Sequence, residues 1–330
     1  MDILRIFTYL LGAICGYLLS APLHECGHLL GGLLTGYRFV SLRVFRVVLS
    51  RDAGEFKLSL LKSRKGAAAG ACDMSPKDDQ AGVFLVNAGG LLVNMGLAIM
   101  ALWLQYVYRS SPALSSFFLG FFLNNMIDFL FNLIPHTYPS ANDGRNLLEL
   151  RNKDARKAYI TCLLLSDTFG KFKCYQDVTE AELMPAATAN KNNYFVVALY
   201  IMLIEYYLAH QQIEKAQQVL DDLHPVGLPH FYQSQLEAYR LYLALIHHDL
   251  ELSKQLRTKE VESAFSLDDT AMLCIKAAYE ILVEGADGDE LLGQLQAHVN
   301  RHPFGENRLG NEYLNQLRRL VENHQNKETV

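Results

Sequence analysis

The chain has 330 residues, half of them hydrophobic and a fifth charged, a length typical of about two domains. Its net charge of −5 divides unevenly, because residues 1–150 carry 12 basic and 10 acidic residues whereas residues 151–330 carry 18 and 25. This composition excludes a disordered chain and a nucleic-acid-binding protein, since apolar content is high and neither half is strongly basic. Six cysteines without CxxC spacing are typical of reduced thiols, so a disulfide scaffold is excluded as well.

Three apolar stretches fill the first 135 residues, and each is long enough to cross a bilayer. We expect spans at about residues 5–36, 82–107 and 113–135, which predicts an integral, multi-pass membrane protein. The first stretch is too long for a signal peptide, and no small-residue cleavage site follows it. It is interrupted by Pro22 and by a polar string at residues 24–28, which is expensive in lipid and therefore predicts a functional site.

The charges of the loops predict the orientation of these spans. The loop at residues 38–81 holds nine Lys or Arg residues, the short second loop holds only Arg109, and five more basic residues follow the third span. The positive-inside rule therefore places the N-terminus outside, and the long loop and everything after Pro135 in the cytoplasm, as in a bacterial-type plasma membrane. Residues 38–62 of that loop lean toward alternating polarity, which predicts a short β region at the membrane surface.

The second half, residues 151–330, has the apolar spacing of helices. Three similar positions recur 37 residues apart, at His210, His247 and Glu284, each where one helix would end and the next begin. This favours antiparallel helix pairs resembling tetratricopeptide repeats, with an ordinary helical bundle as the alternative. We therefore expect a mainly α fold: a three-span membrane core at 1–150 with a short β region, and a cytoplasmic helical repeat-like domain at 151–330 that contacts a protein regulator.

The polar string in the first span has the spacing of a metalloprotease motif. On a helix, His24 and His28 lie one turn apart and project from one face, a spacing that suits one Zn²⁺. Glu25 lies beside them, where it can exchange protons with the attacking water without binding the metal. Two core histidines with an incidental glutamate are the alternative, and three ionisable groups inside a span make that alternative costly.

Zinc in an open catalytic site needs a third protein ligand. Two aspartates compete for this role: Asp143, just after the third span, and Asp128, on a polar stripe inside the third span together with Asn124 and Asn132. His136 is a further candidate, although an interfacial histidine explains it equally well. Asn87 and Asn94 lie seven residues apart on one side of the second span, where they predict either a polar helix contact or substrate binding.

Three elements together resemble the site-2 protease family of intramembrane zinc metalloproteases: His-Glu-x-x-His in the first span, Ala-Gly-Gly-Leu-Leu-Val-Asn at residues 88–94, and Asn-x-x-Pro followed by Asp-Gly after the third span. The resemblance covers about residues 5–150. It implies His24, His28 and Asp143 as zinc ligands and Glu25 as the catalytic acid and base. It also implies that Asn94 engages substrate and that Asn132 and Pro135 position the aspartate. Gly90 stands where the family usually has proline.

We therefore expect an intramembrane zinc metalloendopeptidase that cleaves a transmembrane or membrane-associated peptide near the cytoplasmic side. A transmembrane helix must unwind before cleavage, and an edge strand from residues 39–61 would receive the extended segment. The alternative is a proteolytically inactive membrane scaffold that binds a partner through its helical repeats.

Overall fold

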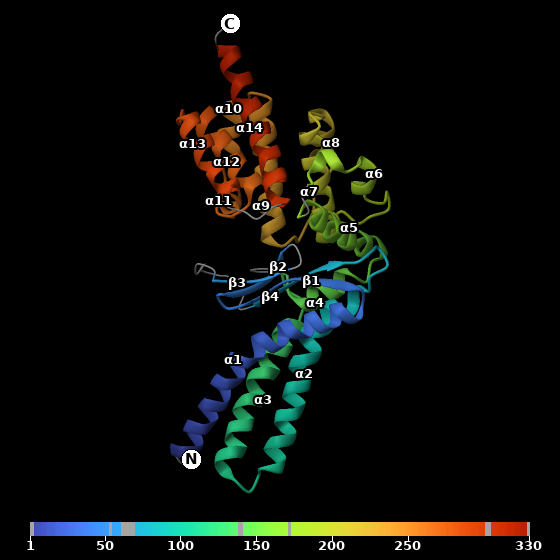
Figure 1. Cartoon of the computed structure of the whole chain (residues 1–330), viewed down its shortest axis with the longest axis vertical. Coiled ribbons are helices and arrows are strands. Elements are labelled where there is room, and N and C mark those ends of the chain that lie inside the picture. The colour runs from blue at the N-terminus through green and yellow to red at the C-terminus, as the bar shows by residue number, and fades with distance from the viewer. Residues whose placement is uncertain are drawn as a thin grey trace. The chain divides into compact units, whose positions relative to one another are not determined.

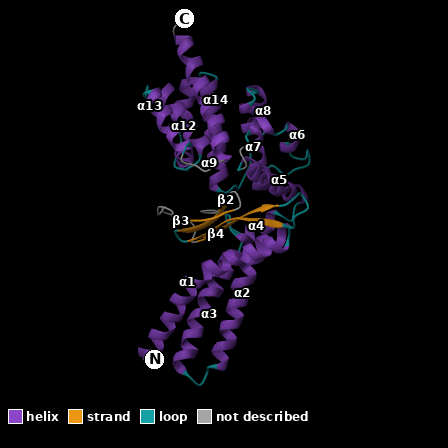
Figure 2. Cartoon of the chain, viewed as in Figure 1, coloured by secondary structure: helices purple, strands orange, loops and turns teal. Residues whose placement is uncertain are grey.

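The computed structural model describes residues 3–52, 55–60, 70–137, 141–170, 173–300 and 305–328. The chain forms two compact units, Met1–Asn152 and Lys153–Val330. The predicted mainly helical fold with a three-helix core and a small β region is confirmed, and Figure 2 shows all described strands in a single sheet.

The first unit is built on three long helices, α1 (Ile3–Leu34), α2 (Val83–Val107) and α3 (Pro112–Leu133), which pack side by side (Figure 1). Each is long and apolar enough to cross a membrane. Large apolar side chains such as Ile14 and Ile127 remain exposed on the outside of the bundle, as expected for surfaces that face lipid.

Glycines let the backbone of α1 lie directly against both neighbouring helices. A Cβ atom at Gly27 would collide with the backbone carbonyl of Gly89 on α2, and one at Gly120 on α3 would collide with that of Tyr9. Small residues at such crossings are typical of packing between membrane helices. Helix α1 therefore packs closely against both neighbouring helices, and this packing fixes the positions of its polar residues.

The sheet contacts α1 through β1 and β4, and lies at the end of the bundle opposite the α2–α3 connection (Figure 1). Its four strands are antiparallel in the order β3-β2-β1-β4. Their bounds are Tyr37–Val44 for β1, Val47–Asp52 for β2, Glu55–Leu60 for β3 and Gly70–Pro76 for β4. The predicted β region at 38–62 covers the first three strands except Tyr37, the first residue of β1. Residues 53, 54, 61 and 62 of that region lie outside the described residues, and β4 was not predicted.

Strand β3 exposes a row of large apolar side chains. Phe56, Leu58 and Leu60 are 65%, 73% and 74% exposed, and alternate residues of a strand share one face. An apolar face of this kind on an edge strand favours contact with lipid or with another apolar surface.

The second unit consists of helices only, within its described residues. Helix α7 packs on α8, α9 on α10 and α12 on α13, so the structure contains consecutive helix pairs. The recurring positions His210 and His247 are the C-cap residues of α7 and α9, and Glu284 directly follows the C-cap of α12. The helices are α5 (Lys153–Phe169), η1 (Tyr175–Asp177), α6 (Glu180–Leu183), α7 (Tyr194–Ala209), α8 (Ile213–Asp221), α9 (His230–Ile246), α10 (Leu250–Leu256), α11 (Lys259–Phe265), α12 (Thr270–Leu282), α13 (Gly288–Val299) and α14 (Gly305–Glu328).

Candidate metal centre

Three side chains predicted as metal ligands meet at one point of the first unit. His24 Nε2 lies 3.0 Å from His28 Nε2, and Asp143 Oδ2 lies 3.1 Å and 3.3 Å from these two nitrogens. All three side chains are largely buried, at 10%, 13% and 15% exposure. Among the described residues, this is the one group of three or more His, Cys, Asp or Glu side chains whose ligand atoms converge in this way.

The two histidines converge because α1 continues through them as regular helix. Residues four apart lie on one face of a helix, and the edge-on contact of the two rings, with centroids 4.7 Å apart, follows from that spacing. His28 Nδ1 lies 2.7 Å from the carbonyl oxygen of Val86 on α2. Because a carbonyl only accepts, Nδ1 carries the proton, and the lone pair of Nε2 points to the site in the neutral imidazole.

Asp143 reaches the histidines because the residue before it, Asn142, is hydrogen-bonded to the end of α3. Asp143 is the first residue of α4 (Asp143–Glu149), and Asn142 caps this helix by accepting a hydrogen bond from the Arg145 N–H. The Asn142 amide nitrogen also donates to the carbonyls of Phe131 and Ile134, both at 2.7 Å. One side chain thus fixes the start of α4 and ties it to the end of α3.

The donor set fits a tetrahedral metal ion. Bonds of about 2.0 Å from zinc to its ligands require neighbouring ligand atoms about 3.3 Å apart, which agrees with the three separations between Nε2, Nε2 and Oδ2. Asp143 Oδ2 is buried, and its polar neighbours among the described residues are the ring nitrogens of His24 and His28. Burial would raise the pKa of Asp143, but the adjacent His24 and His28 outweigh it and bring that pKa down to about 2. The two rings lower this pKa through hydrogen bonds and positive charge, and a metal cation held between the three side chains would supply the positive charge in their place.

Helix α2 leaves room at the point where the three ligands meet. A Cβ atom at Gly90 would collide with His24 Nε2 and lie 2.6 Å from His28 Nε2. Any side chain at this position would therefore occupy the space between the ligand atoms. Sequence reasoning noted Gly90 only as a departure from the family pattern and did not find this role.

Glu25 is buried beside the ligands but outside their set. Its carboxylate lies against Gly70 at the start of β4, where a Cβ atom would come within 2.5 Å of Oε1. The thiol of Cys72 interacts with Glu25, and burial together with the charges of Glu25 and Asp73 raises the pKa of that thiol to about 12. The thiol is therefore protonated at neutral pH, whereas a carboxylate such as Glu25 can exchange protons beside the candidate ligands.

The other candidate residues have partners of their own. Asp128 accepts a hydrogen bond from Asn124, 3.1 Å away, and Asn132 donates to the Asp128 carbonyl, so this stripe forms contacts within α3. His136 contacts Asn142 and the Ile134 carbonyl. Neither Asp128 nor His136 belongs to the convergent group.

The two asparagines of α2 are both buried. Asn87 donates to the Val83 carbonyl of its own helix at 2.8 Å. Asn94 is 1% exposed and accepts a long hydrogen bond, 3.5 Å, from Ser20 on α1. These contacts agree with a polar helix contact and leave the predicted substrate-binding roles untested.

No family model, no curated protein and no solved structure matches this chain. The resemblance to the site-2 protease family therefore remains a prediction from the sequence motifs. Sequence reasoning missed Asn142, although an Asn directly before Asp-Gly is a recognisable helix N-cap signal.

Proposed function

We propose that the chain is an intramembrane zinc metalloendopeptidase of the site-2 protease type. The observation that carries the proposal is the tetrahedral spacing of the His24, His28 and Asp143 ligand atoms, with the Glu25 carboxylate buried beside them inside a bundle long and apolar enough to cross a membrane. Buried ionisable groups at this depth are costly unless they serve a function, and the HExxH spacing gives them one.

The chemistry divides between the metal and Glu25. Zinc held by the three ligands would lower the pKa of the attacking water and polarise the scissile carbonyl. Glu25 accepts a proton from that water at a carboxylate oxygen and passes it to the nitrogen of the leaving amine. Because the Glu25 side chain is buried against Gly70, bulk water is kept from its carboxylate, which strengthens its interactions with the reacting atoms.

We assign substrate binding to the edge of β4 with which no described strand pairs. A transmembrane substrate must unwind before cleavage, because its amides are hydrogen-bonded within its own helix. The sequence predicts the receiving edge within residues 39–61, where the edge strand is β3. Two strands separate β3 from β4, and β4 is the strand that begins beside Glu25. Strand β4 begins beside Glu25 and pairs with β1 on one side, so a substrate strand added at its other side would lie next to the proposed acid and base.

The proposed orientation places the N-terminus outside, the sheet and residues 153–330 in the cytoplasm, and the metal centre near the cytoplasmic end of the membrane bundle. The Lys and Arg bias of the loops supports this, since the sheet segment is rich in basic residues and the α2–α3 turn carries only Arg109. Cleavage would then occur near the cytoplasmic side, and the helical unit would meet cytoplasmic segments of substrates or a regulator.

The decisive experiment measures zinc and cleavage in the same preparations. Full-length protein in detergent is analysed for zinc by mass spectrometry and for cleavage of a panel of quenched-fluorescent transmembrane peptides. Glu25→Gln should keep stoichiometric zinc and lose cleavage, whereas His24→Ala should lose both. Asp128→Asn is the matched control, because this side chain lies outside the convergent group and the variant should keep zinc.

Two results would contradict the proposal. Full cleavage by Glu25→Gln would remove its central assignment. Wild-type protein that holds no zinc, or holds zinc and cleaves no peptide in the panel, would favour the alternative of an inactive membrane scaffold.

A further inference from the structure

The three membrane helices carry two carboxyl side chains, Glu25 beside the candidate metal centre and Asp128 on α3. The proposed chemistry uses Glu25 and leaves Asp128 without a role. An acidic side chain inside a membrane span is costly, and such residues are retained where they bind a partner or a substrate. Asp128 is therefore the residue of the bundle whose presence most needs an explanation.

The contacts of Asp128 leave part of its carboxylate available. Asn124 donates a hydrogen bond to Oδ2 at 3.1 Å. Asn124 is itself packed against α1, because a Cβ atom at Gly16 would lie 3.0 Å from its Cβ atom. Asp128 is partly exposed, and its other oxygen, Oδ1, accepts no hydrogen bond from a described residue and is not enclosed. A neutral amide thus holds one oxygen, and the other can accept a hydrogen bond from outside the bundle.

This chain supplies no counter-ion at the level of Asp128. Arg5 is the one Lys or Arg within the three helices. It precedes Gly16, which packs on Asn124, by eleven residues, or about 16 Å of helix toward the end of the bundle opposite the sheet (Figure 1). A second copy in the same orientation would bring its own Arg5 to that distant level as well. The charge of Asp128 therefore fits a basic group from a different molecule.

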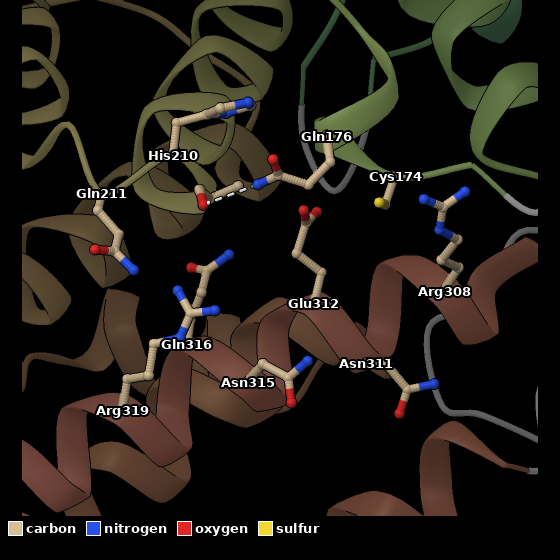
Figure 3. Close-up of a pocket in the computed structure, with 11 residues that line it drawn as sticks. Cys174, Gln176, His210, Gln211, Arg308, Asn311, Glu312, Asn315, Gln316 and Arg319 are labelled. Carbon is tan, nitrogen blue, oxygen red and sulfur yellow. Dashed lines mark hydrogen bonds between the residues drawn. The ribbon is translucent and has the colours of Figure 1, made fainter.

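Buried carboxylates of the second unit differ from Asp128 in this respect. Glu312 projects into a cavity of about 580 Å³ between α14 and the wall formed by η1 and the end of α7 (Figure 3). It accepts a hydrogen bond from the Tyr175 N–H at 3.1 Å and interacts with the side chains of Cys174 and Gln176. Its partners come from its own unit, so it does not indicate a ligand.

Asp128 lies a short distance from the candidate metal centre along α3. It precedes Leu133, the last residue of that helix, by five residues, which is about 8 Å along the axis. Gly144, the neighbour of Asp143, packs on the Leu133 carbonyl, because a Cβ atom there would lie 2.0 Å from the carbonyl oxygen. A chain bound at Asp128 would thus reach the level of the metal centre within about three extended residues.

From these features we propose that Asp128 binds a Lys or Arg side chain within the transmembrane segment of the substrate, a few residues from the scissile bond. This inference rests on the proposed proteolytic function and adds the substrate class: membrane proteins that carry a basic residue inside a transmembrane segment. The ammonium or guanidinium group donates to Oδ1 in a charge-assisted hydrogen bond. The pair also compensates two charges that would each be costly alone in lipid.

The test measures peptide binding in bilayers by energy transfer from Trp103, the single tryptophan of the chain, to a dansyl group on the peptide. Full-length Glu25→Gln protein is used, so that no peptide is cleaved during the measurement. Tryptophan-free transmembrane peptides carry one lysine, acetyl-lysine or leucine at successive positions in the cytoplasmic half of the span. Where the residue is level with Asp128, lysine should tighten binding about tenfold relative to leucine, and the uncharged acetyl-lysine should not.

Adding Asp128→Asn should make the lysine and leucine peptides bind equally. Asp79→Asn is the matched control, because it removes an exposed carboxylate from the loop before α2 and should retain the tenfold preference. Near-ultraviolet circular dichroism establishes that both variants are folded. The proposal is overturned if lysine gives no preference at any position, or if Asp128→Asn retains the preference.

Cleavage by the protein with Glu25 intact separates this inference from the function on which it rests. Tighter binding of the lysine peptide without cleavage of any peptide would contradict the proposed protease and leave the recognition of a basic residue in place. Equal binding and equal cleavage of the lysine and leucine peptides would reject the role of Asp128 and leave the protease in place.

Discussion

The absence of a side chain at residue 90 matters more for the metal centre than most side chains around it. Two ligand nitrogens lie where its Cβ atom would be, and α2 approaches them with backbone alone. A methyl group at this position must displace an imidazole or move α2, and both changes disturb the spacing of the ligand atoms.

Gly90→Ala should therefore lower zinc occupancy strongly, because ligand positions must hold to within about 0.5 Å for tight binding. Zinc content and competition with a fluorescent chelator measure the loss. Gly96→Ala is the matched control, since it adds the same methyl group to the same helix where nothing lies within 4 Å. Equal zinc affinity of the two variants would show that Gly90 does not shape the site.

A second residue of interest is Glu205 on α7, which is buried in the helical unit and accepts hydrogen bonds from Tyr175, Tyr239 and Tyr313. Burial raises its pKa from 4.5 to about 7, and the tyrosine hydroxyls lower it by less than burial raises it. Asp269 is the other charged group that acts on it, and its negative charge raises the pKa further.

This shift predicts how stability depends on pH. Between about pH 4.5 and pH 7, Glu205 is ionised in the unfolded chain and protonated in the folded chain. The stability that this protonation gives is complete below pH 4.5 and is lost as the pH rises toward 7. The loss is about 3 kcal/mol for a shift of this size. Urea unfolding at pH 5 and pH 8, followed by the tyrosine circular dichroism signal, measures it.

Glu205→Gln should remove this part of the pH dependence, since an amide does not titrate. Glu251→Gln, which changes an exposed glutamate on α10, should retain it. A pH dependence that is the same in wild type and Glu205→Gln would contradict the assignment.

The residue pattern predicted that His24 and His28 converge because their geometry is local: the HExxH spacing already sets both on one face of a helix. The choice between Asp128 and Asp143 was not local. It depended on the fold of the loop after α3, which Asn142 determines through contacts with carbonyls up to eleven residues away. The role of Gly90 could not be predicted for the same reason, since it comes from the packing of α2 on α1.

At the scale of elements, β4 is the strand that connects the sheet to the metal centre. Its sequence, Gly-Ala-Cys-Asp-Met-Ser-Pro, is poor in the β-branched and aromatic residues that favour strands. It forms a strand because β1 supplies a pairing edge and α1 supplies a packing surface. The three membrane helices were predictable, because their signal is a long apolar run and needs no partner.

Proline substitution in β4 tests the proposed substrate edge. In an antiparallel pair, N–H groups of successive residues point alternately toward the partner strand and away from it. Of Ala71 and Cys72, one has a backbone N–H that points away from β1 in the wild-type protein. Proline at that residue should leave zinc bound and remove most cleavage, because proline has no N–H to donate to a substrate strand.

Leu58→Pro and Ser59→Pro on β3 are the matched pair at the opposite edge of the sheet. Proline at whichever of these two residues has an outward N–H in the wild type should leave both zinc binding and cleavage unchanged. Full cleavage by both β4 variants would exclude strand addition at this edge.

At the scale of the whole molecule, the basic residues predict on which side of the membrane each part lies. A phosphatase reporter that is active only outside the cytoplasm should be inactive after Val330 and active when inserted in the α2–α3 turn next to Arg109. A reporter that fluoresces only in the cytoplasm should give the opposite pattern. Phosphatase activity after Val330 would place the helical unit outside and contradict the proposed orientation.

The candidate metal centre joins segments that are distant in the chain, since α1 carries two of the candidate ligands and α4, more than a hundred residues later, carries the third. A metal held there acts as a cross-link that closes a long loop, so binding and folding of the first unit become thermodynamically linked. Each tenfold rise in free zinc above the dissociation constant would then add about 1.4 kcal/mol to the stability of the folded unit. The cell's supply of zinc would thereby set the lifetime of the protein as well as its activity.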